Sequence, residues 1–340
     1  MVISVSGFGY SGSGAVLDYL REFSENYILT DIEMNLIYIP DGVQDLEYHL
    51  CENHYRFMSS DVAIQRFLER MVIISERLSK KHREVFIELT KEYISSLIQV
   101  QWQGYSFIHR GEYNRRQRYW IFKFPARIRY IMGRIGIRLP PVKNPQRTMY
   151  LSINPEHFLE LTQHYLYSII SMFSNGAERD KNIVIDQLFA ADNIDTCIKY
   201  IPDCKVISVI RDPRDIYLLL KEGIKPKISF IPTDTVENFT EYYLRLMDPK
   251  ACKSSNGLVV KFEDLIYRYE ETTKKICEYL QLPWQNSKIF FNPDVSIRNT
   301  QLYRRYPQYN ADIEYIESKC IDYLYKFDKK IDIDIKRNVF

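Results

Sequence analysis

Two stretches of the chain carry residue types suited to holding a phosphate or sulfate group. The first, residues 6–14, is rich in glycine and serine and lies between an apolar run and an amphipathic run. A strand, a glycine-rich turn and a helix form an anion cradle, because successive backbone N–H groups point inward and the helix N-terminus favours negative charge. Gly7 and Gly12 have the spacing that opens a Walker A loop, but Ser13-Gly14 stands where Lys-Ser/Thr is expected. The stretch therefore predicts anion binding without ATP or GTP hydrolysis; a purely structural turn is the alternative.

The second stretch is Arg-Asp-Pro-Arg-Asp at residues 211–215, which follows the apolar run 205–210. Arginines at the end of a strand and the start of a helix can hold a phosphate with their guanidinium groups and with backbone N–H groups together. We expect Asp212 and Asp215 to cap the helix and to orient the arginines. The alternative is an ordinary charged turn.

Carboxylates also follow a predicted strand. The run 27–30 is read as a strand, and Asp31 and Glu33 come directly after it. In an open α/β sheet, ligands bind at the carboxyl ends of the strands. Asp31 and Glu33 are thus candidates for a general base or a hydroxyl-binding group, unless they cap the next helix or turn.

These stretches require a sheet to position them. Apolar runs predict strands at 2–5, 27–30, 182–186 and 205–210 and one beginning at 257, and residues 15–20, 155–175, 270–280 and 311–325 have helical patterns. Residues 296–310 read as a loop. Residues 41–112 are predicted to be mainly helical, with helices at 45–53, 59–78 and 82–103. A chain of 340 residues can form one large α/β domain or two small ones.

Residues 113–155 differ in charge from everything around them. No acidic residue lies between Glu112 and Glu156, and apolar side chains alternate with the basic residues Arg115, Arg116, Arg118, Lys123, Arg127, Arg129, Arg134, Arg138, Lys143 and Arg147. A basic segment with an apolar face is attracted to anionic surfaces and inserts by its apolar side chains. The expected partner is a phospholipid interface, an anionic glycan or a lipid-pyrophosphate carrier; the alternative is a solvated face that packs on the domain.

Composition narrows the class of protein. The net charge of +2 gives no argument for nucleic-acid binding. The six cysteines have no CxxC or zinc-like spacing, which favours reduced thiols, no metal site and a cytoplasmic location. No run of about 18 apolar residues occurs, and no leader precedes the first strand, so we expect neither secretion nor a membrane span.

Taken together, the motifs resemble the sulfotransferase superfamily that uses 3′-phosphoadenosine 5′-phosphosulfate (PAPS). Residues 9–14 resemble its 5′-phosphosulfate loop, and residues 205–215 resemble its 3′-phosphate segment. Residues 260–265 and 276–283 resemble the strand and the helix that follow in the family, and residues 298–307 resemble its nucleotide-covering loop. The motifs follow the family order and extend to about residue 325. The resemblance is nearest to bacterial enzymes of surface-polysaccharide clusters. It implies a single α/β domain over 1–340, a P-loop-type parallel β-sheet flanked by helices, with 41–175 as a helical and basic insertion that forms the acceptor side.

The resemblance also implies roles for single residues. The loop residues Gly9, Tyr10, Ser11, Gly12, Ser13 and Gly14 would surround the 5′-phosphosulfate, and the backbone N–H groups of the last four would bind it. Arg211 would hold the 3′-phosphate, with Arg298 or a neighbouring arginine closing over it. Asp186, at the end of its strand, and Glu33 are the candidate general bases, and the sequence does not rank them.

Two positions depart from the family pattern. Tyr10 stands where members carry Lys or Arg, and Leu219 stands where they usually carry a serine that touches the 3′-phosphate. Either another cation, one between Arg110 and Lys123 for example, replaces the missing one, or the chain binds a nucleotide without efficient transfer.

The expected function is metal-independent transfer of a sulfuryl group from PAPS to a carbohydrate hydroxyl, on a lipid-linked or surface polysaccharide. The alternatives are a catalytically weak homologue that binds a nucleotide or a glycan, and a small-molecule P-loop kinase. The acceptor and the oligomeric state are not predicted.

Overall fold

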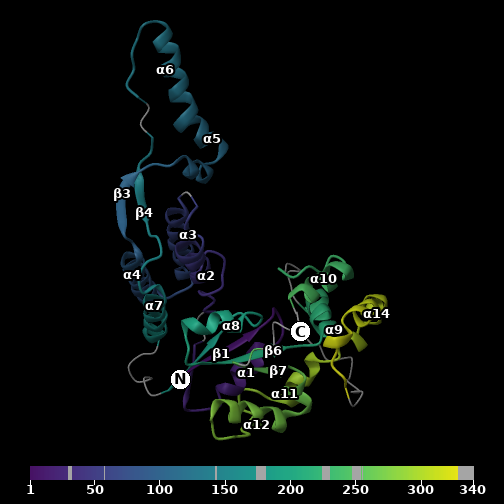
Figure 1. The fold of residues 1–340 in the computed structure, drawn as a ribbon. Helices are drawn as coiled ribbons and strands as arrows, with labels where there is room; N and C mark the ends of the chain where they lie inside the picture. Colours follow the sequence, from purple (N-terminus) through teal and green to yellow (C-terminus); the bar gives the residue numbers. More distant parts are fainter. Residues whose placement is uncertain are drawn as a thin grey trace.

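The computed structural model describes residues 1–29, 33–56, 58–141, 144–173, 181–223, 230–246, 254 and 256–327 (Figure 1). Its centre is a sheet of five parallel strands in the order β2-β5-β1-β6-β7. The strands are β1 Val2–Gly7, β2 Asn26–Leu29, β5 Asn182–Asp186, β6 Cys204–Ile210 and β7 Gly257–Lys261. The predicted α/β fold with a parallel sheet is confirmed.

The strands alternate their side chains between two cores, as a pleated sheet requires. Ile3 and Val5 face the core shared with α1 (Ser13–Leu20) and α12 (Tyr269–Leu280). Val206 faces the opposite core, which is covered by α2 (Val43–Glu47), α3 (Ser59–Ser75), α4 (Lys80–Leu97), α7 (Phe158–Phe173) and α8 (Ile194–Cys197). Because both faces are covered, even the serines of β1, Ser4 and Ser6, are buried.

A third core lies at one end of the sheet. It joins α9 (Pro213–Leu218), α10 (Val236–Leu246) and α14 (Asn310–Lys319). α10 was not predicted, and the last helix ends at Lys319, earlier than the predicted residue 325. The remaining short helices and turns are η1 Tyr48–Glu52, η5 Ile198–Tyr200, η6 Leu219–Gly223, α11 Asp264–Tyr267, α13 Pro293–Ser296, η7 Ile297–Asn299, η8 Leu302–Arg304, η9 Pro307–Tyr309 and η10 Ile321–Tyr323.

The helical region predicted between 41 and 112 is confirmed, apart from its end. The predicted helix 82–103 stops at Leu97, and β3 (Val100–Gly104) follows it. β3 pairs antiparallel with β4 (Arg147–Leu151), so a distant strand decided the conformation of these residues. The helix predicted at 155–175 begins at Phe158 in the structure, and its predicted cap at 175–176 lies outside the described residues.

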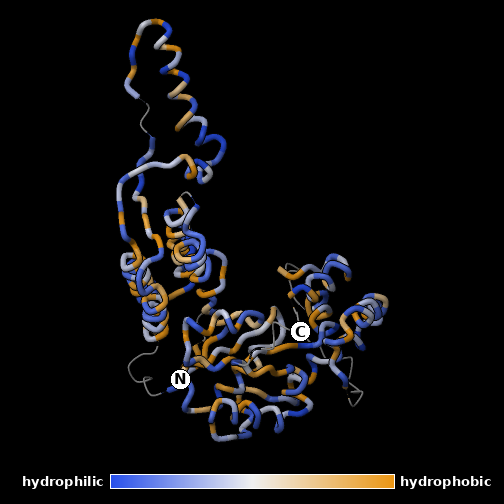
Figure 2. The backbone as a smooth tube through the Cα atoms, in the orientation of Figure 1, coloured by the Kyte–Doolittle hydropathy of each residue, from blue (hydrophilic) through white to orange (hydrophobic). Residues whose placement is uncertain are grey.

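The described residues between β3 and β4, 105–141 and 144–146, extend away from the sheet, and we call them the arm (Figure 1). The arm contains η2 (Phe107–Glu112), α5 (Arg115–Arg118), η3 (Tyr119–Lys123) and α6 (Phe124–Arg134). Apolar and polar residues alternate along α6 (Figure 2). Over the part of the chain that the structure describes, no helix is long and apolar enough to cross a membrane.

A buried ionic network fixes the base of the arm to α3. His109 contacts Asp61 through Nε2 at 2.9 Å and Glu112 through Nδ1 at 2.7 Å. Arg147 pairs with Glu112 at 2.6 Å, and the Tyr150 backbone N–H donates to Asp61 Oδ1 at 2.9 Å. The exposed fractions of Asp61 and His109 are 1% and 3%, so the contact between these two side chains is shielded from water.

Removing one member of such a network leaves buried partners uncompensated. We expect Asp61→Ala to lower the free energy of unfolding by about 3 kcal/mol, and Asp61→Asn, which keeps an acceptor for Tyr150, to cost less. Urea denaturation measures both. The control is Glu271→Ala, which breaks the exposed Glu271–Lys275 pair and should leave the free energy of unfolding unchanged within experimental error. Equal stability of Asp61→Ala and the control would contradict a structural role for the network.

Candidate functional site

Three of the sequence-predicted stretches meet at one edge of the sheet. β1 lies between β5 and β6, with Val5 in register with Asp186 and Gly7 in register with Val209. Asp186 ends β5, the glycine-rich loop follows β1, and Arg211 follows β6. β1 is also where the strand order changes direction, the position at which open α/β sheets bind ligands.

The loop after β1 has the conformation of an anion cradle. Tyr10 and Gly12 adopt left-handed φ angles of 65° and 93°, and Gly12 caps the N-terminus of α1. The Gly7 backbone N–H donates to Gln187 Oε1 at 3.3 Å, which ties the loop to the end of β5. The Ser11 side chain is buried, and its Oγ has no hydrogen-bond partner among the described residues. A buried polar atom without a partner at a helix N-terminus is suited to an anionic ligand.

Tyr10 brings an aromatic ring to this loop. Its ring stacks on Phe230, with centroids 6.0 Å apart and planes 18° from parallel.

The described residues from Arg110 to Lys123 lie on the arm, which the β3–β4 hairpin separates from the sheet (Figure 1). The expectation that one of their cations replaces the missing loop cation is therefore wrong for this conformation.

Arg211 is buried and bridges the loop to a distant segment. Its Nη1 donates to Tyr10 O at 3.1 Å and its Nη2 to Asn299 O at 2.5 Å. The guanidinium lies 4.8 Å from the Phe262 ring centroid, and Nε has no partner among the described residues. Burial lowers the pKa of Arg211, while nearby carboxyl groups, Asp215 first, oppose the shift.

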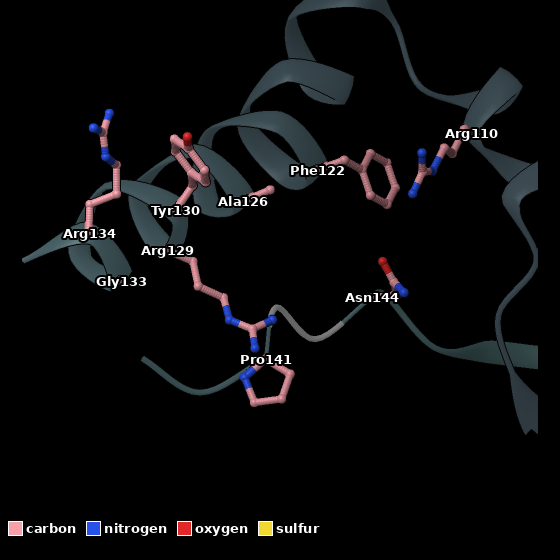
Figure 3. A pocket seen from close by; sticks show the side chains of 9 residues that line it. All are labelled: Arg110, Phe122, Ala126, Arg129, Tyr130, Gly133, Arg134, Pro141 and Asn144. Atoms are coloured by element: carbon pink, nitrogen blue, oxygen red, sulfur yellow. The ribbon is translucent and has the colours of Figure 1, made fainter. Parts of the chain in front are cut away.

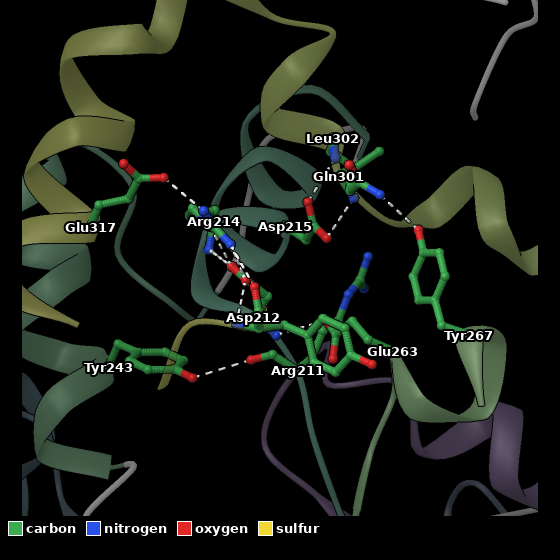
Figure 4. Close-up of polar contacts among 11 residues, drawn as sticks. Arg211, Asp212, Arg214, Asp215, Tyr243, Glu263, Tyr267, Gln301, Leu302 and Glu317 are labelled. Atoms are coloured by element: carbon green, nitrogen blue, oxygen red, sulfur yellow. Dashed lines mark hydrogen bonds and ion pairs between the residues drawn. The ribbon is translucent and has the colours of Figure 1, made fainter. Parts of the chain in front are cut away.

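The other residues of 211–215 are structural (Figure 4). Asp212 caps α9 by accepting from the Arg214 backbone N–H at 2.9 Å, as predicted, and pairs with Arg214 Nη2 at 2.6 Å. Arg214 also pairs with Glu317 at 2.7 Å. Asp215 forms no ion pair with an arginine among the described residues; it accepts hydrogen bonds from the backbone N–H groups of Gln301 and Leu302 at 2.9 and 2.7 Å. Asp215 thus holds the C-terminal segment, a role that the sequence did not indicate.

The carboxyl groups around Arg211 are held toward their neutral forms. Burial, and then the charge of Asp212, raise the pKa of Glu263 to about 8 and that of Asp215 to about 7. Burial therefore favours the neutral form of Glu263. The positive charge of Arg211 is not fully cancelled by these neighbours, and it remains available to an anion.

Two arginines of the C-terminal segment differ in their surroundings. Arg298, the predicted one, is exposed on η7, one residue before the carbonyl that Arg211 binds. Arg305 is half-buried, and its Nε and Nη2 have no hydrogen-bond partner among the described residues. Burial lowers the pKa of Arg305, while Tyr306 and then Asp215, which also acts on Arg211, oppose this shift. The sequence allowed a neighbour of Arg298, but nothing in it distinguished Arg305.

The two candidate bases interact electrostatically at the end of β5. Asp186 is half-buried, its Oδ1 has no partner among the described residues, and its backbone carbonyl accepts from the Met34 N–H at 3.1 Å. Burial first and the charge of Glu33 second raise the pKa of Asp186 to about 6. Glu33 is exposed, and burial with the charges of Glu33 and Asp186 raises the pKa of Tyr38 beside them. Asp31 lies outside the described residues. No cluster of three or more potential metal-ligating side chains occurs within the described ranges.

Gly12 is the loop position with the tightest steric requirement. A Cβ there would lie 2.5 Å from the Phe262 ring, and a left-handed φ is unfavourable for alanine. We expect Gly12→Ala to lower the free energy of unfolding by about 2 kcal/mol, measured by urea denaturation. In Gly14→Ala the new methyl group meets nothing within 4 Å, and this control should be neutral or more stable by up to about 1 kcal/mol. If the two variants are equally stable, the loop does not have the described conformation.

Comparison with known proteins gives one family match over more than half of the chain. The sequence model described as the sulfotransferase family matches residues 94–286. No curated protein matches this chain.

Three solved structures resemble it weakly along most of their length. They are the sulfotransferase domain of an olefin synthase from Synechococcus PCC 7002 (12% identity, 98% of this chain and 90% of that one, TM-score 0.37), sulfotransferase STF9 from Mycobacterium avium (11%, 98% and 77%, 0.38) and a sulfotransferase domain from the curacin biosynthetic pathway (11%, 96% and 98%, 0.38). The family assignment rests on the match over residues 94–286.

Proposed function

The chain belongs to the sulfotransferase family, and we propose that it moves a sulfuryl group from PAPS to a hydroxyl of a carbohydrate. The observation that carries the donor proposal is the hydrogen bond from Arg211 Nη1 to Tyr10 O at 3.1 Å. It joins two anion-binding elements at the ends of neighbouring strands. PAPS has two separate anionic ends, and such a pair of elements suits it.

The polar atoms without partners fit this donor. The phosphosulfate would lie against the backbone N–H groups of residues 11–14 and the buried Ser11 Oγ. The 3′-phosphate would be held by Arg211, whose Nε is free of protein partners among the described residues, with Arg305 or Arg298 closing over it. No metal is needed for this arrangement.

The base proposal rests on the position of Asp186 across the loop from Arg211. In the strand order β5-β1-β6, the carboxylate, the phosphosulfate loop and the arginine lie in sequence along one edge. An acceptor hydroxyl would enter from the β5 side, next to the insertion 41–175. With a pKa of about 6, Asp186 is mostly ionised at pH 7 and can take the hydroxyl proton while the new S–O bond forms. Glu33 then acts through its charge, by raising the pKa of Asp186.

The carbohydrate acceptor is proposed from the resemblance to surface-polysaccharide enzymes. A lipid-linked glycan at the cytoplasmic face of a membrane would suit the basic arm, which we assign to the acceptor side.

A second candidate function is nucleotide binding without efficient transfer. It is favoured by the stacking of Tyr10 on Phe230, because this loop position supplies no cation to the bridging oxygen of the donor. Absence of such a stabilising group costs about 3 kcal/mol of transition-state stabilisation in comparable sites.

Calorimetric titration with 3′-phosphoadenosine 5′-phosphate (PAP), alongside ATP, tests the donor site. We expect micromolar affinity for PAP, weaker binding of ATP, and a loss of about tenfold or more in Arg305→Ala and Arg211→Lys. Arg211→Ala should lose more, provided that its circular dichroism spectrum is native. The control is Arg245→Ala, which breaks an exposed pair with Glu241 on α10. Absence of PAP binding by folded wild-type protein would exclude the donor site.

The pH profile of transfer tests the base. With labelled PAPS and a glycan acceptor found by screening, kcat/KM should fall as the pH drops through about 6, because Asp186 becomes protonated there. Asp186→Asn should lower kcat by about 100-fold or more. Glu33→Gln should retain most activity and move the acidic limb to lower pH, because Glu33 raises the pKa of Asp186. The reverse pattern would make Glu33 the base.

A further inference from the structure

The arm carries an amphipathic helix that the described protein leaves uncovered. α6 has no buried residue along its eleven positions. Tyr130, Ile131 and Ile135 are 68%, 50% and 65% exposed, and Trp120, in the turn before the helix, is 53% exposed. Amphipathic helices are stabilised mainly by burying their apolar side chains. The exposed apolar residues of the arm therefore indicate a partner outside this chain.

The same helix lines a basic groove of about 670 Å³ (Figure 3). Phe122, Arg129 and Arg134 lie along α6 or the turn before it, and Arg110 and Asn144 line the groove from the two ends of the arm. Arg110 lies over the Phe122 ring at 4.6 Å. None of the lining residues is acidic.

The positive charge that lines the groove is not paired with acidic side chains among the described residues. Arg129 and Arg134 form no ion pair or hydrogen bond among the described residues, and Arg110 donates its Nε to the Tyr105 hydroxyl at 2.6 Å. Glu112, the nearest acidic residue in sequence, is engaged by Arg147 and His109. Guanidinium groups bind phosphate oxygens, which makes lipid phosphate a suitable ligand for this groove.

We propose that the arm docks on an anionic phospholipid bilayer, with the groove holding lipid phosphate and the apolar side chains inserted beside it. Charge and exposed apolar surface occur on one short element, which is the combination that interfacial helices use. Tryptophan and tyrosine at 120 and 130 are residue types enriched at the membrane interface. A soluble polyanion would use the arginines and leave the isoleucines exposed. Pairing of two arms from two copies would bring like charges together.

This docking does not depend on sulfuryl transfer. The β3–β4 hairpin connects the docked arm to the sheet, and the ionic network of His109 fixes the hairpin to α3. The sheet would therefore be carried at the membrane by a connected, structured element. If the proposed function holds, an acceptor on a lipid carrier would be within the same surface layer.

Vesicle sedimentation with the full chain tests the proposal. The protein should bind phosphatidylcholine vesicles that contain phosphatidylglycerol and not those of phosphatidylcholine alone. Arg129→Glu with Arg134→Glu should weaken the partition constant by about tenfold or more. The matched control, Lys80→Glu with Lys81→Glu at the exposed start of α4, makes the same change in net charge and should bind like wild type. Ile131→Ser with Ile135→Ser should keep binding in low salt and lose it in high salt.

Trp120 reports insertion directly. Its fluorescence should shift to the blue with anionic vesicles, and Trp120→Phe should remove the shift. Equal binding to both vesicle types, or unchanged binding of the arginine double variant, would overturn the proposal. So would binding to a soluble anionic polysaccharide in the absence of vesicle binding, or an arm-dependent dimer by light scattering that does not bind vesicles. None of these readouts requires PAPS, so a failed donor site leaves the test intact.

Discussion

The arrangement of the candidate site depends on the hydrogen bonds that compensate for the burial of the charged Arg211 side chain. A guanidinium removed from water requires hydrogen bonds, and Arg211 obtains two of them from the carbonyl groups of Tyr10 and Asn299. These carbonyls belong to opposite ends of the chain, so one arginine requires the glycine-rich loop and the C-terminal segment to meet at the end of β6. Burial, and then the charge of Asp212, raise the pKa of the neighbouring Glu263 to about 8, and the charge of Arg211 opposes this shift.

The two arginines of the 211–215 stretch have different roles. Arg214 is saturated by carboxylates of Asp212 and Glu317 and fixes α9 against α14. Arg211 is satisfied largely by neutral carbonyls, which leave its charge in place. A cation held by carbonyls stays attractive to an anion, whereas one held by carboxylates is neutralised.

Local sequence patterns were sufficient to predict the elements whose conformation depends on residues close in sequence. Residues 182–186 form a strand with the predicted bounds, because an apolar run between polar turns has few other solutions in a covered sheet. β3 was predicted as helix because its pairing with β4 lies in a segment more than 40 residues later. In the site, Arg211, Asp186 and Glu33 were predicted candidates, and the structure brings the two carboxylates together. The pairing of Arg214 with Glu317 could not be predicted, because Glu317 lies about a hundred residues away in the sequence.

The position of β1 in the sheet has a consequence for how the protein is made. β1 leaves the ribosome before β5 and β6, so its register partners Ile183 and Cys204 are synthesised long after it. Until then, the glycine-rich loop has no neighbouring strand to shape it. The helices and arm between them are formed mostly by contacts close in sequence and can acquire structure earlier. Sheet closure is therefore a late, long-range step, and a nascent chain halted before β5 would expose an unpaired apolar strand that chaperones must protect.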